Sequence, residues 1–385
     1  MVEYLKRTWT EIDLDAIVHN YKKIEAATSA KMMPVIKADA YGHGATPIAK
    51  EYEKLGAAYF AVSSLDEAMQ LRNGGITTPI LILGYTPPTQ TQELLEAGIS
   101  QTVYDETMAG EFSARAQALG KKLTVHIKID TGMSRLGLRF HDETETGCAE
   151  QILRIASMPG LWCEGICTHF TSADEADNPF TLRQFALFSH LLSAVERRGV
   201  TFSLRHCANS AAVENFKETP LDLVRPGIIL YGLAAGEKES SLDLRPAMQL
   251  ISVVSSVHEL QAGDCVSYGQ TFRASGPMRV ATVPIGYADG YPRKLSGVGK
   301  VQIGGKWVPV LGRVCMDQCV VDISAVEGTV SPGDRVVLMG GGYGAKEIAD
   351  LCGTINYEIV CGISKRVPRL FLKGGEVVEK IEYLL

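Results

Sequence analysis

The chain has 385 residues, which exceeds one ordinary domain and suits a barrel of about 250 residues followed by a second unit. Hydrophobic residues make up 46% and charged residues 21%, as in a globular protein with an ample core, and a formal net charge of −6 without long charged runs argues against a nucleic-acid partner. Because the N-terminus has no apolar signal region and no apolar run reaches membrane-spanning length, we expect a cytoplasmic protein with no membrane partner.

Residues 10–240 are predicted to alternate between strands and helices. Segments of helical period separate apolar runs, as at 46–55, where Pro47 suits the first turn and Gly56 the end. Eight strands alternating with helices are typical of an α/β fold, the (β/α)8 TIM-type barrel, and a doubly wound open sheet is the competing interpretation. The predicted strands are 33–37, 59–63, 79–84, 101–104, 123–129, 161–168, 202–206 and 222–231.

Residues 241–385 are predicted to form a C-terminal, mainly-β domain, with residues 1–9 packing against it. Short strands there are separated by Gly, Pro and Asp turns, and only 345–352 has the pattern of a helix. The glycine-rich segment 340–345 matches a dinucleotide-binding pattern. Such a site needs a parallel βαβ unit, so a glycine-rich turn is favoured, and a dinucleotide-dependent oxidoreductase stays as an alternative.

The nine cysteines show no framework for disulfides or metal. Cys163 and Cys167 are four apart, as are Cys315 and Cys319, and neither pair has the spacing of a zinc site. We expect reduced thiols and no metal.

Lys37 follows the apolar run 33–36 and precedes a loop broken by glycine. An ammonium at the end of a buried strand is costly unless chemistry uses it, and partial burial lowers the pKa of lysine and exposes an amine nucleophile. The plainer interpretation is a lysine whose stem packs while its amine reaches water.

Other polar residues also follow predicted strands, at the rim where a barrel of this type carries its chemistry. Each has a plainer interpretation, such as a core histidine, an N-cap serine or a surface arginine, but together they indicate a site. Loops after strands seven and eight often bind phosphate, and a phosphate site opposite a lysine suggests pyridoxal 5'-phosphate. The residues are Lys128, Asp130 and Arg135 after strand five, His169 after six, Asn209 and Ser210 after seven, and Arg225, Pro226 and Gly227 in eight.

Residues 35–44, with the sequence VIKADAYGHG, resemble the pyridoxal-lysine signature of bacterial alanine racemases. The resemblance implies an isomerase that interconverts L- and D-alanine by two-base proton transfer on pyridoxal phosphate, supplies D-alanine for peptidoglycan, and works as a homodimer with shared sites. A racemase of serine or another small amino acid, a related decarboxylase and a non-catalytic pyridoxal phosphate carrier are the alternatives. The matches continue in the family's order at 128–137, His169, 206–212, 225–232, 266–269, 285–290, 312–318 and 355–358.

The resemblance also implies roles for particular residues. Lys37 would bind the cofactor as a Schiff base and act as one base, and Tyr268 of a second subunit would be the other. His169 and Arg225 would favour the phenolate of Tyr268. Arg225 would face the pyridine nitrogen, where the related decarboxylases have a carboxylate, and so favour simple proton exchange.

The remaining implied residues bind substrate and cofactor. Arg135 would orient the cofactor's phenolic oxygen and the substrate carboxylate, and Lys128 would be carbamylated and hold Arg135. The partner subunit would add Met316, Asp317 and Tyr287 to the substrate pocket and its entrance. The other cofactor-binding positions are Tyr41, Asn209, Ser210, Gly227, Ile228 and Tyr357.

Overall fold

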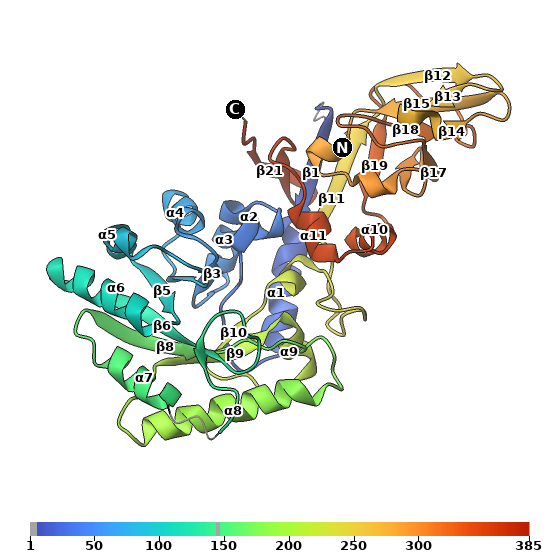
Figure 1. Cartoon of the computed structure of the whole chain (residues 1–385). Coiled ribbons are helices and arrows are strands. Elements are labelled where there is room, and N and C mark those ends of the chain that lie inside the picture. Colours follow the sequence, from blue (N-terminus) through green and yellow to red (C-terminus); the bar gives the residue numbers. More distant parts are fainter. Residues whose placement is uncertain (1–5, 144–146, 385) are drawn as a thin grey trace.

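The structure, a computed structural model, describes residues 6–143 and 147–384. Figure 1 shows an elongated molecule with a barrel at one end and a β-rich part that extends away from it. Within the described ranges, no helix has both the length and the apolarity needed to cross a membrane.

In the described residues, eight parallel strands form the barrel in the order β2-β10-β9-β8-β6-β5-β4-β3. The sheet closes on itself because Val35 bridges Ala61 in parallel. A closed parallel sheet confirms the predicted barrel and excludes the doubly wound alternative. The strands are β2 (Lys31–Met32), β3 (Phe60–Val62), β4 (Ile80–Ile82), β5 (Ile99–Val103), β6 (Leu123–Asp130), β8 (Leu161–Cys167), β9 (Leu204–Asn209) and β10 (Leu223–Arg225), and the short β7 (Leu138–Arg139) pairs with β6.

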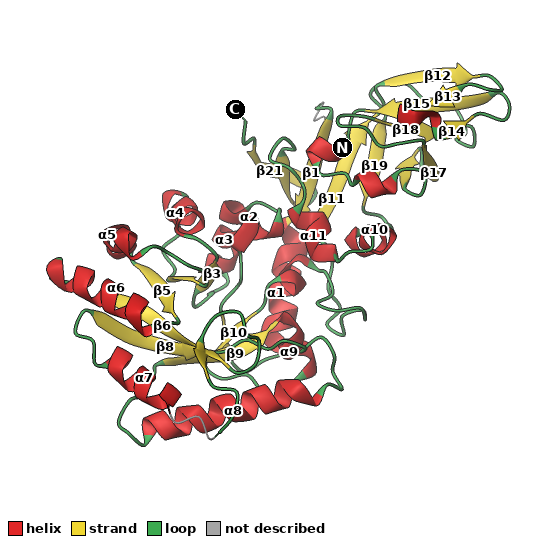
Figure 2. Ribbon diagram, in the orientation of Figure 1, coloured by secondary structure: helices red, strands yellow, loops and turns green. Residues whose placement is uncertain are grey.

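Helices cover the outside of these strands, as Figure 2 shows in red around yellow. Several begin at a side chain that accepts a hydrogen bond from the first turn, including Asp13, Ser64, Asp105 and Asn178, which are residue types that commonly cap helices. The helices are α1 (Leu14–Ala26), α3 (Ala45–Lys54), α4 (Leu65–Asn73), α5 (Thr91–Glu96), α6 (Glu106–Ala118), α7 (Gly147–Ala156), α8 (Pro179–Glu196) and α9 (Ser210–Asn215).

Two predicted barrel strands differ most from the observed ones. The first was placed at 33–37, but the chain leaves the sheet after the bridge at Val35 and turns into α2 (Lys37–Tyr41). The last was placed at 222–231, but the strand ends at Arg225, because Pro226 has no N–H to continue a ladder. The apolar residues beyond it form the 3-10 helix η2 (Ile228–Tyr231). These residues are buried as a helix and not as part of the sheet.

The second part is a sheet in the order β12-β15-β18-β17-β16-β19-β11-β1-β20-β21. Strand β1 (Thr8–Asp13) lies between β11 and β20 (Arg369–Lys373), so the start and end of the chain share one sheet. Residues 1–5 of the predicted N-terminal segment lie outside the described residues. The other strands are β11 (Met248–Val253), β12 (Ser256–Leu260), β15 (Met278–Val283), β16 (Lys300–Ile303), β17 (Lys306–Leu311), β18 (Cys319–Asp322), β19 (Arg335–Met339) and β21 (Glu376–Ile381).

The predicted helix at 345–352 is α10 (Ala345–Cys352), but a second helix, α11 (Asn356–Cys361), was missed because it is only six residues long. The glycine-rich turn before α10 follows β19, which pairs antiparallel with β11 and β16. Glu347 accepts a hydrogen bond from Gly344 N–H at 2.7 Å and places a negative charge where a dinucleotide phosphate would bind. The turn therefore lacks both the βαβ setting and the electrostatics of a dinucleotide site.

Candidate active site

Lys37 opens a left-handed turn at the carboxyl end of the first barrel strand. Residues 38–41 all have φ between 51° and 54°, a region that costs L-residues about 1–2 kcal/mol each. Such strain persists only where the surroundings hold it, and it is common at active sites. The turn fixes the direction in which Lys37 and Tyr41 leave the backbone.

Three hydrogen bonds to the side chains of two residues, Glu67 and His43, hold this turn. Ala38 N–H donates to Glu67 Oε1 at 2.7 Å. The His43 Nδ1–H donates to the carbonyls of Ala40 and Tyr41, at 3.0 and 2.9 Å. The sequence predicted a loop here but not its left-handed backbone conformation, because alanine and tyrosine do not favour that conformation.

His43 gives the protein an expected loss of stability in acid. Burial lowers the pKa of His43 from 6.5 to about 4, so from pH 6.5 down to 4 the unfolded chain binds a proton that the folded chain does not. The free energy of unfolding should therefore fall through this window, by up to about 3 kcal/mol from this residue alone. Urea unfolding at steps between pH 7 and 4 measures the slope.

The variant His43→Asn keeps a donor near the position of Nδ1 and removes the titration, so its pH slope should be flatter than that of the wild type. His258→Gln, on the exposed face of β12, is the matched control and should leave the slope unchanged. An identical slope in wild type and His43→Asn would contradict this assignment.

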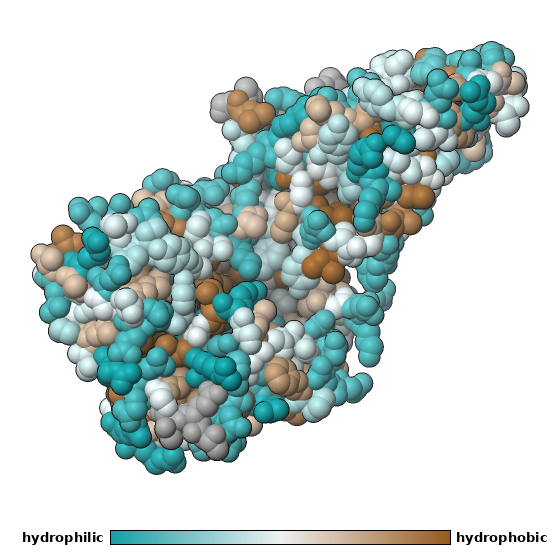
Figure 3. Space-filling view, viewed as in Figure 1, coloured by the Kyte–Doolittle hydropathy of each residue, from teal (hydrophilic) through white to brown (hydrophobic). Residues whose placement is uncertain are grey.

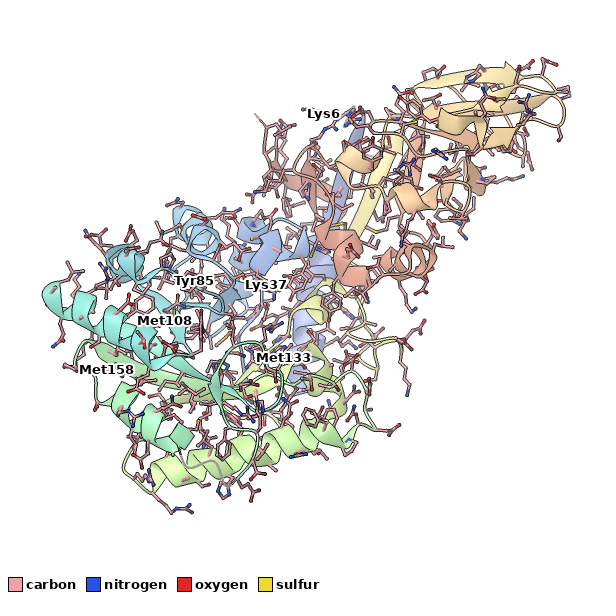
Figure 4. All side chains as sticks on the ribbon, in the orientation of Figure 1. Lys6, Lys37, Tyr85, Met108, Met133 and Met158 are labelled. Atoms are coloured by element: carbon pink, nitrogen blue, oxygen red, sulfur yellow. The ribbon has the colours of Figure 1, made fainter. Side chains whose placement is uncertain are left out.

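A cavity of about 880 Å³ opens at the carboxyl rim of the barrel and is bounded on its far side by α10 and α11. Figure 3 shows the hollow between the two parts of the molecule, with hydrophobic atoms beside it. Lys37 and Met133, labelled in Figure 4, reach it from the turn after β2 and the loop after β6. The predicted site residues that line it are Lys37, Tyr41, Lys128, Arg135, His169, Asn209, Ser210, Arg225, Gly227 and Tyr357.

One end of the cavity is rich in neutral hydrogen-bond donors. The rings of Tyr41 and Tyr357 lie 6.0 Å apart, and burial raises the pKa of both, so their hydroxyls stay protonated. Ser210 Oγ accepts from Gly227 N–H at 2.8 Å. A Cβ at position 227 would lie 2.5 Å from Tyr41 Oη, so only glycine leaves this cradle open. The arrangement suits a bound anion.

Asn209 and Ile228 support this cradle. The Asn209 side chain caps α9 by accepting from Ala212 N–H at 3.0 Å, so the N-cap is Asn209 and the Ser210 hydroxyl is released for the cavity. Ile228 does not line the cavity with its side chain, which is fully buried at the start of η2.

Arg225 is a buried cation at the base of the cavity. Its NH2 group donates to the carbonyls of Thr168 and Cys207 and to His169 Nδ1, at 2.9, 3.0 and 3.1 Å. Its NH1 group donates to His206 Nδ1 at 2.7 Å. Burial lowers the pKa of Arg225, but a guanidinium stays protonated in proteins, so it acts as a donor only.

The charges around Lys37 make its amine more readily neutral than a surface lysine. Burial and the nearby Arg135 lower the pKa of Lys37. Burial also lowers the pKa of Lys128, which lies close to Arg135 and Arg225. Several cations share one cavity, which is expected where a polyanionic ligand binds.

The other predicted site residues, Tyr268, Tyr287, Met316 and Asp317, do not reach this cavity. Tyr268 is 72% exposed at the start of η3 (Tyr268–Gln270), between β13 (Cys265–Val266) and β14 (Phe272–Arg273). Its neighbour Ser267 has φ of 64°, and its hydroxyl donates to Arg313 O at 2.6 Å.

The four residues nevertheless lie on loops that contact one another. Tyr287 N–H and Ala288 N–H donate to the carbonyls of Cys315 and Met316, at 3.1 and 3.0 Å. The Ser267 hydroxyl also contacts Cys315 Sγ at 3.2 Å. One exposed surface of the β-rich part therefore carries the whole second group.

His126, His206 and Glu164 were not singled out from the sequence, yet they continue the hydrogen bonds of Arg225 into the barrel interior. Two histidines inside otherwise apolar strands were the available signal, because buried polar side chains need partners. Within residues 6–143 and 147–384, no group of three or more His, Cys, Asp or Glu side chains could hold a metal ion.

A partly buried lysine, a cradle of hydroxyl groups and a buried guanidinium at the carboxyl rim are typical of a (β/α)8-barrel enzyme site that binds an anionic small molecule. Comparison with known proteins shows to which family this chain belongs. The N-terminal domain family of alanine racemase matches residues 12–235 and the C-terminal domain family matches residues 247–371. The chain therefore belongs to the alanine racemase family, a family of pyridoxal phosphate-dependent isomerases.

Individual relatives are similar to this chain along nearly its whole length. The chain is 46% identical to the alanine racemase of Desulforamulus reducens over 369 residues, covering 94% of this chain and 98% of the relative. The structure of alanine racemase from Clostridium difficile 630 superposes with a TM-score of 0.95 at 38% identity, covering 100% of both chains. That of Bartonella henselae alanine racemase, which has covalently bound pyridoxal phosphate, gives 0.86 at 28% identity over 95% of this chain and 100% of that one.

Proposed function

We propose that this protein interconverts L- and D-alanine by two-base proton transfer on bound pyridoxal phosphate, in a homodimer whose sites are shared. Lys37 supports the proposal most directly, because it is a partly buried amine of lowered pKa beside the anion cradle in a chain of this family. Supply of D-alanine for peptidoglycan and a cytoplasmic location follow from the same proposal.

The cavity residues fit pyridoxal phosphate. The protonated hydroxyls of Tyr41 and Tyr357, with Ser210 and the open backbone at Gly227, would hold its phosphate, with Ile228 adding its backbone N–H and Asn209 supporting the strand end. The Lys37 amine would hold its aldehyde carbon and Arg225 its ring nitrogen. When bound, this cofactor withdraws electrons from Cα of an amino acid and makes the Cα proton removable.

Lys37 and Tyr268 would move the proton on opposite faces of Cα. Lys37 is suited to this because its lowered pKa makes the neutral amine accessible. Tyr268 would enter from a second copy, since it is exposed and outside the cavity of its own chain.

His169 would prepare Tyr268 for this role. Because Arg225 donates to His169 Nδ1, and burial with the charge of Arg225 holds the pKa of His169 well below its usual value, this imidazole carries its proton on Nε2. Nε2–H is then a donor that favours a phenolate oxygen on the tyrosine of the second copy.

Arg135 and Lys128 would place the substrate carboxylate. The planar guanidinium of Arg135 suits a carboxylate. The lowered pKa of Lys128 favours the neutral amine that reacts with carbon dioxide, and the resulting carbamate would be an anion beside Arg135. Met316, Asp317 and Tyr287 of the second copy would complete the substrate pocket and its entrance.

The test is a racemisation screen. Purified protein with added pyridoxal phosphate is incubated with L-alanine, L-serine and other small amino acids, and the D-enantiomer and carbon dioxide are measured. We expect D-alanine to form until the two enantiomers are nearly equal. A preference for serine would replace the substrate, carbon dioxide release would favour a decarboxylase, and no product from any amino acid would refute a racemase.

A further inference from the structure

A continuous row of polar side chains runs from Arg225 into the apolar interior of the barrel. Arg225 NH1 contacts His206 Nδ1 at 2.7 Å, His206 Nε2 contacts His126 Nδ1 at 2.9 Å, and His126 Nε2 contacts Glu164 Oε2 at 3.4 Å. These residues come from four barrel strands, β10, β9, β6 and β8. These hydrogen bonds thus connect Arg225, at the base of the cavity, to the carboxylate of Glu164.

The direction of every hydrogen bond in this row is fixed by its two ends. A guanidinium can only donate, so His206 Nδ1 must be an acceptor and its proton must lie on Nε2. That proton is donated to His126 Nδ1, so the proton of His126 must also lie on Nε2, where it is donated to Glu164. Burial and the charge of Arg225 hold the pKa of His206 well below its usual value, which keeps this imidazole neutral.

Glu164 is held as the accepting end. Burial raises the pKa of its carboxyl, but hydrogen bonds from His126 and Tyr59 outweigh this effect and leave it lowered. Tyr59 OH donates to Glu164 Oε2 at 2.8 Å and also bonds Ser100 Oγ at 2.6 Å. The carboxylate is therefore ionised and accepts from both neighbours.

The fold makes room for this row at a cost in packing. His126 and His206 are both fully buried, where polar groups need every partner to offset lost solvation. A Cβ at Gly165 would lie 2.4 Å from His126 Nδ1, so β8 leaves room for the imidazole only because residue 165 has no side chain. Apolar residues of similar size would fill the same space more simply.

We propose that Glu164 and His126 are positioning residues of the active site: they fix the tautomer of His206, so that Arg225 meets a hydrogen-bond acceptor and keeps its guanidinium aimed at the ring nitrogen of the bound cofactor. This proposal rests on the proposed function for its effect on catalysis. Without the carboxylate, both histidines can exchange tautomers, and a His206 Nδ1–H would oppose the Arg225 N–H donor. The guanidinium would then keep only the hydrogen bonds of its NH2 group, and its NH1 side would turn away from His206.

The direct test is nitrogen NMR of protein labelled with 15N-histidine, with and without pyridoxal phosphate, using His206→Gln and His126→Gln to assign the signals. In the wild type we expect the proton on Nε2 of both residues from pH 6 to 9. A proton on Nδ1 of His206 would overturn the proposal, whatever the protein's activity, so its failure is distinguishable from failure of the proposed function.

Variants then test the effect on catalysis. Glu164→Leu should mix the tautomers of His126 and His206 and lower kcat for L-alanine roughly 10-fold with little change in KM. Glu164→Gln, whose amide oxygen still accepts from His126, should restore the wild-type tautomers and most of kcat. Ser113→Ala, which removes an unrelated buried hydrogen bond to Gly160 N–H, controls for general loss of stability and should change neither.

Two results would overturn the positioning role: Glu164→Leu keeping wild-type kcat, or its kcat falling while the His206 tautomer is unchanged. If Glu164→Leu does not fold, the wild-type tautomers and Glu164→Gln decide the question.

Discussion

Replacing Lys37 with alanine is expected to abolish covalent attachment of pyridoxal phosphate and to lower racemisation by about 10,000-fold. The physical reason is that Lys37 is a partly buried amine of the cavity, and under the proposed function its lowered pKa would make it the nucleophile and one of the two bases. Borohydride reduction followed by mass spectrometry of the 35–44 peptide measures the attachment, and the L-alanine assay measures the rate. Phosphate binding by Tyr41, Ser210 and Gly227 should persist, so the cofactor should still bind reversibly.

Lys54→Ala is the matched control, because Lys54 is 65% exposed and pairs with Glu51 on the surface helix α3. Its attachment and rate should equal those of the wild type. Retained racemisation in Lys37→Ala would rule out the assigned role of Lys37.

Tyr268→Phe is expected to lower racemisation by about 100- to 10,000-fold and to affect the two enantiomers unequally. Removal of one hydroxyl leaves the Lys37 base, which should still exchange the Cα hydrogen of one enantiomer. Incubating L- and D-alanine separately in D2O and following deuterium at Cα by NMR measures the two half-reactions.

Tyr85→Phe serves as the control, since Tyr85 is also an exposed tyrosine, at 61%, and does not line the cavity. An equal and minor loss of exchange for both enantiomers in Tyr268→Phe would argue against two bases.

The architecture was largely predictable from local patterns. Apolar runs separated by helical segments located the barrel strands, since a buried parallel strand leaves a short continuous apolar signature. The strand boundaries that were predicted wrongly lie where the chain changes direction while the polarity of its residues stays the same. The left-handed turn at 38–41 contains no glycine that would have indicated it. The apolar residues after Pro226 have a pattern that fits a strand and a buried 3-10 helix equally well.

The position of the site was predictable, but its internal connections were not. Residues at strand ends must share one rim, so Lys37, His169 and Arg225 could be grouped from the sequence. The contact of His206 with His126 depends on the register of strands that are 80 residues apart in sequence, and sequence pattern does not specify that register. The family resemblance implied that Tyr268 acts from a second subunit, and the fold shows that it is exposed and outside the cavity of its own chain.

In the proposed dimer, Lys37 of one copy and Tyr268 of another form one active site, and mixing two inactive variants tests this sharing. Lys37→Ala and Tyr268→Phe are purified separately, mixed in equal amounts, dissociated and allowed to reassociate. Half of the dimers should then be mixed and contain one intact site, so activity should recover to about a quarter of the wild-type value, as symmetric sharing requires. No recovery above the two separate variants, with mixed dimers present, would contradict a site shared between copies.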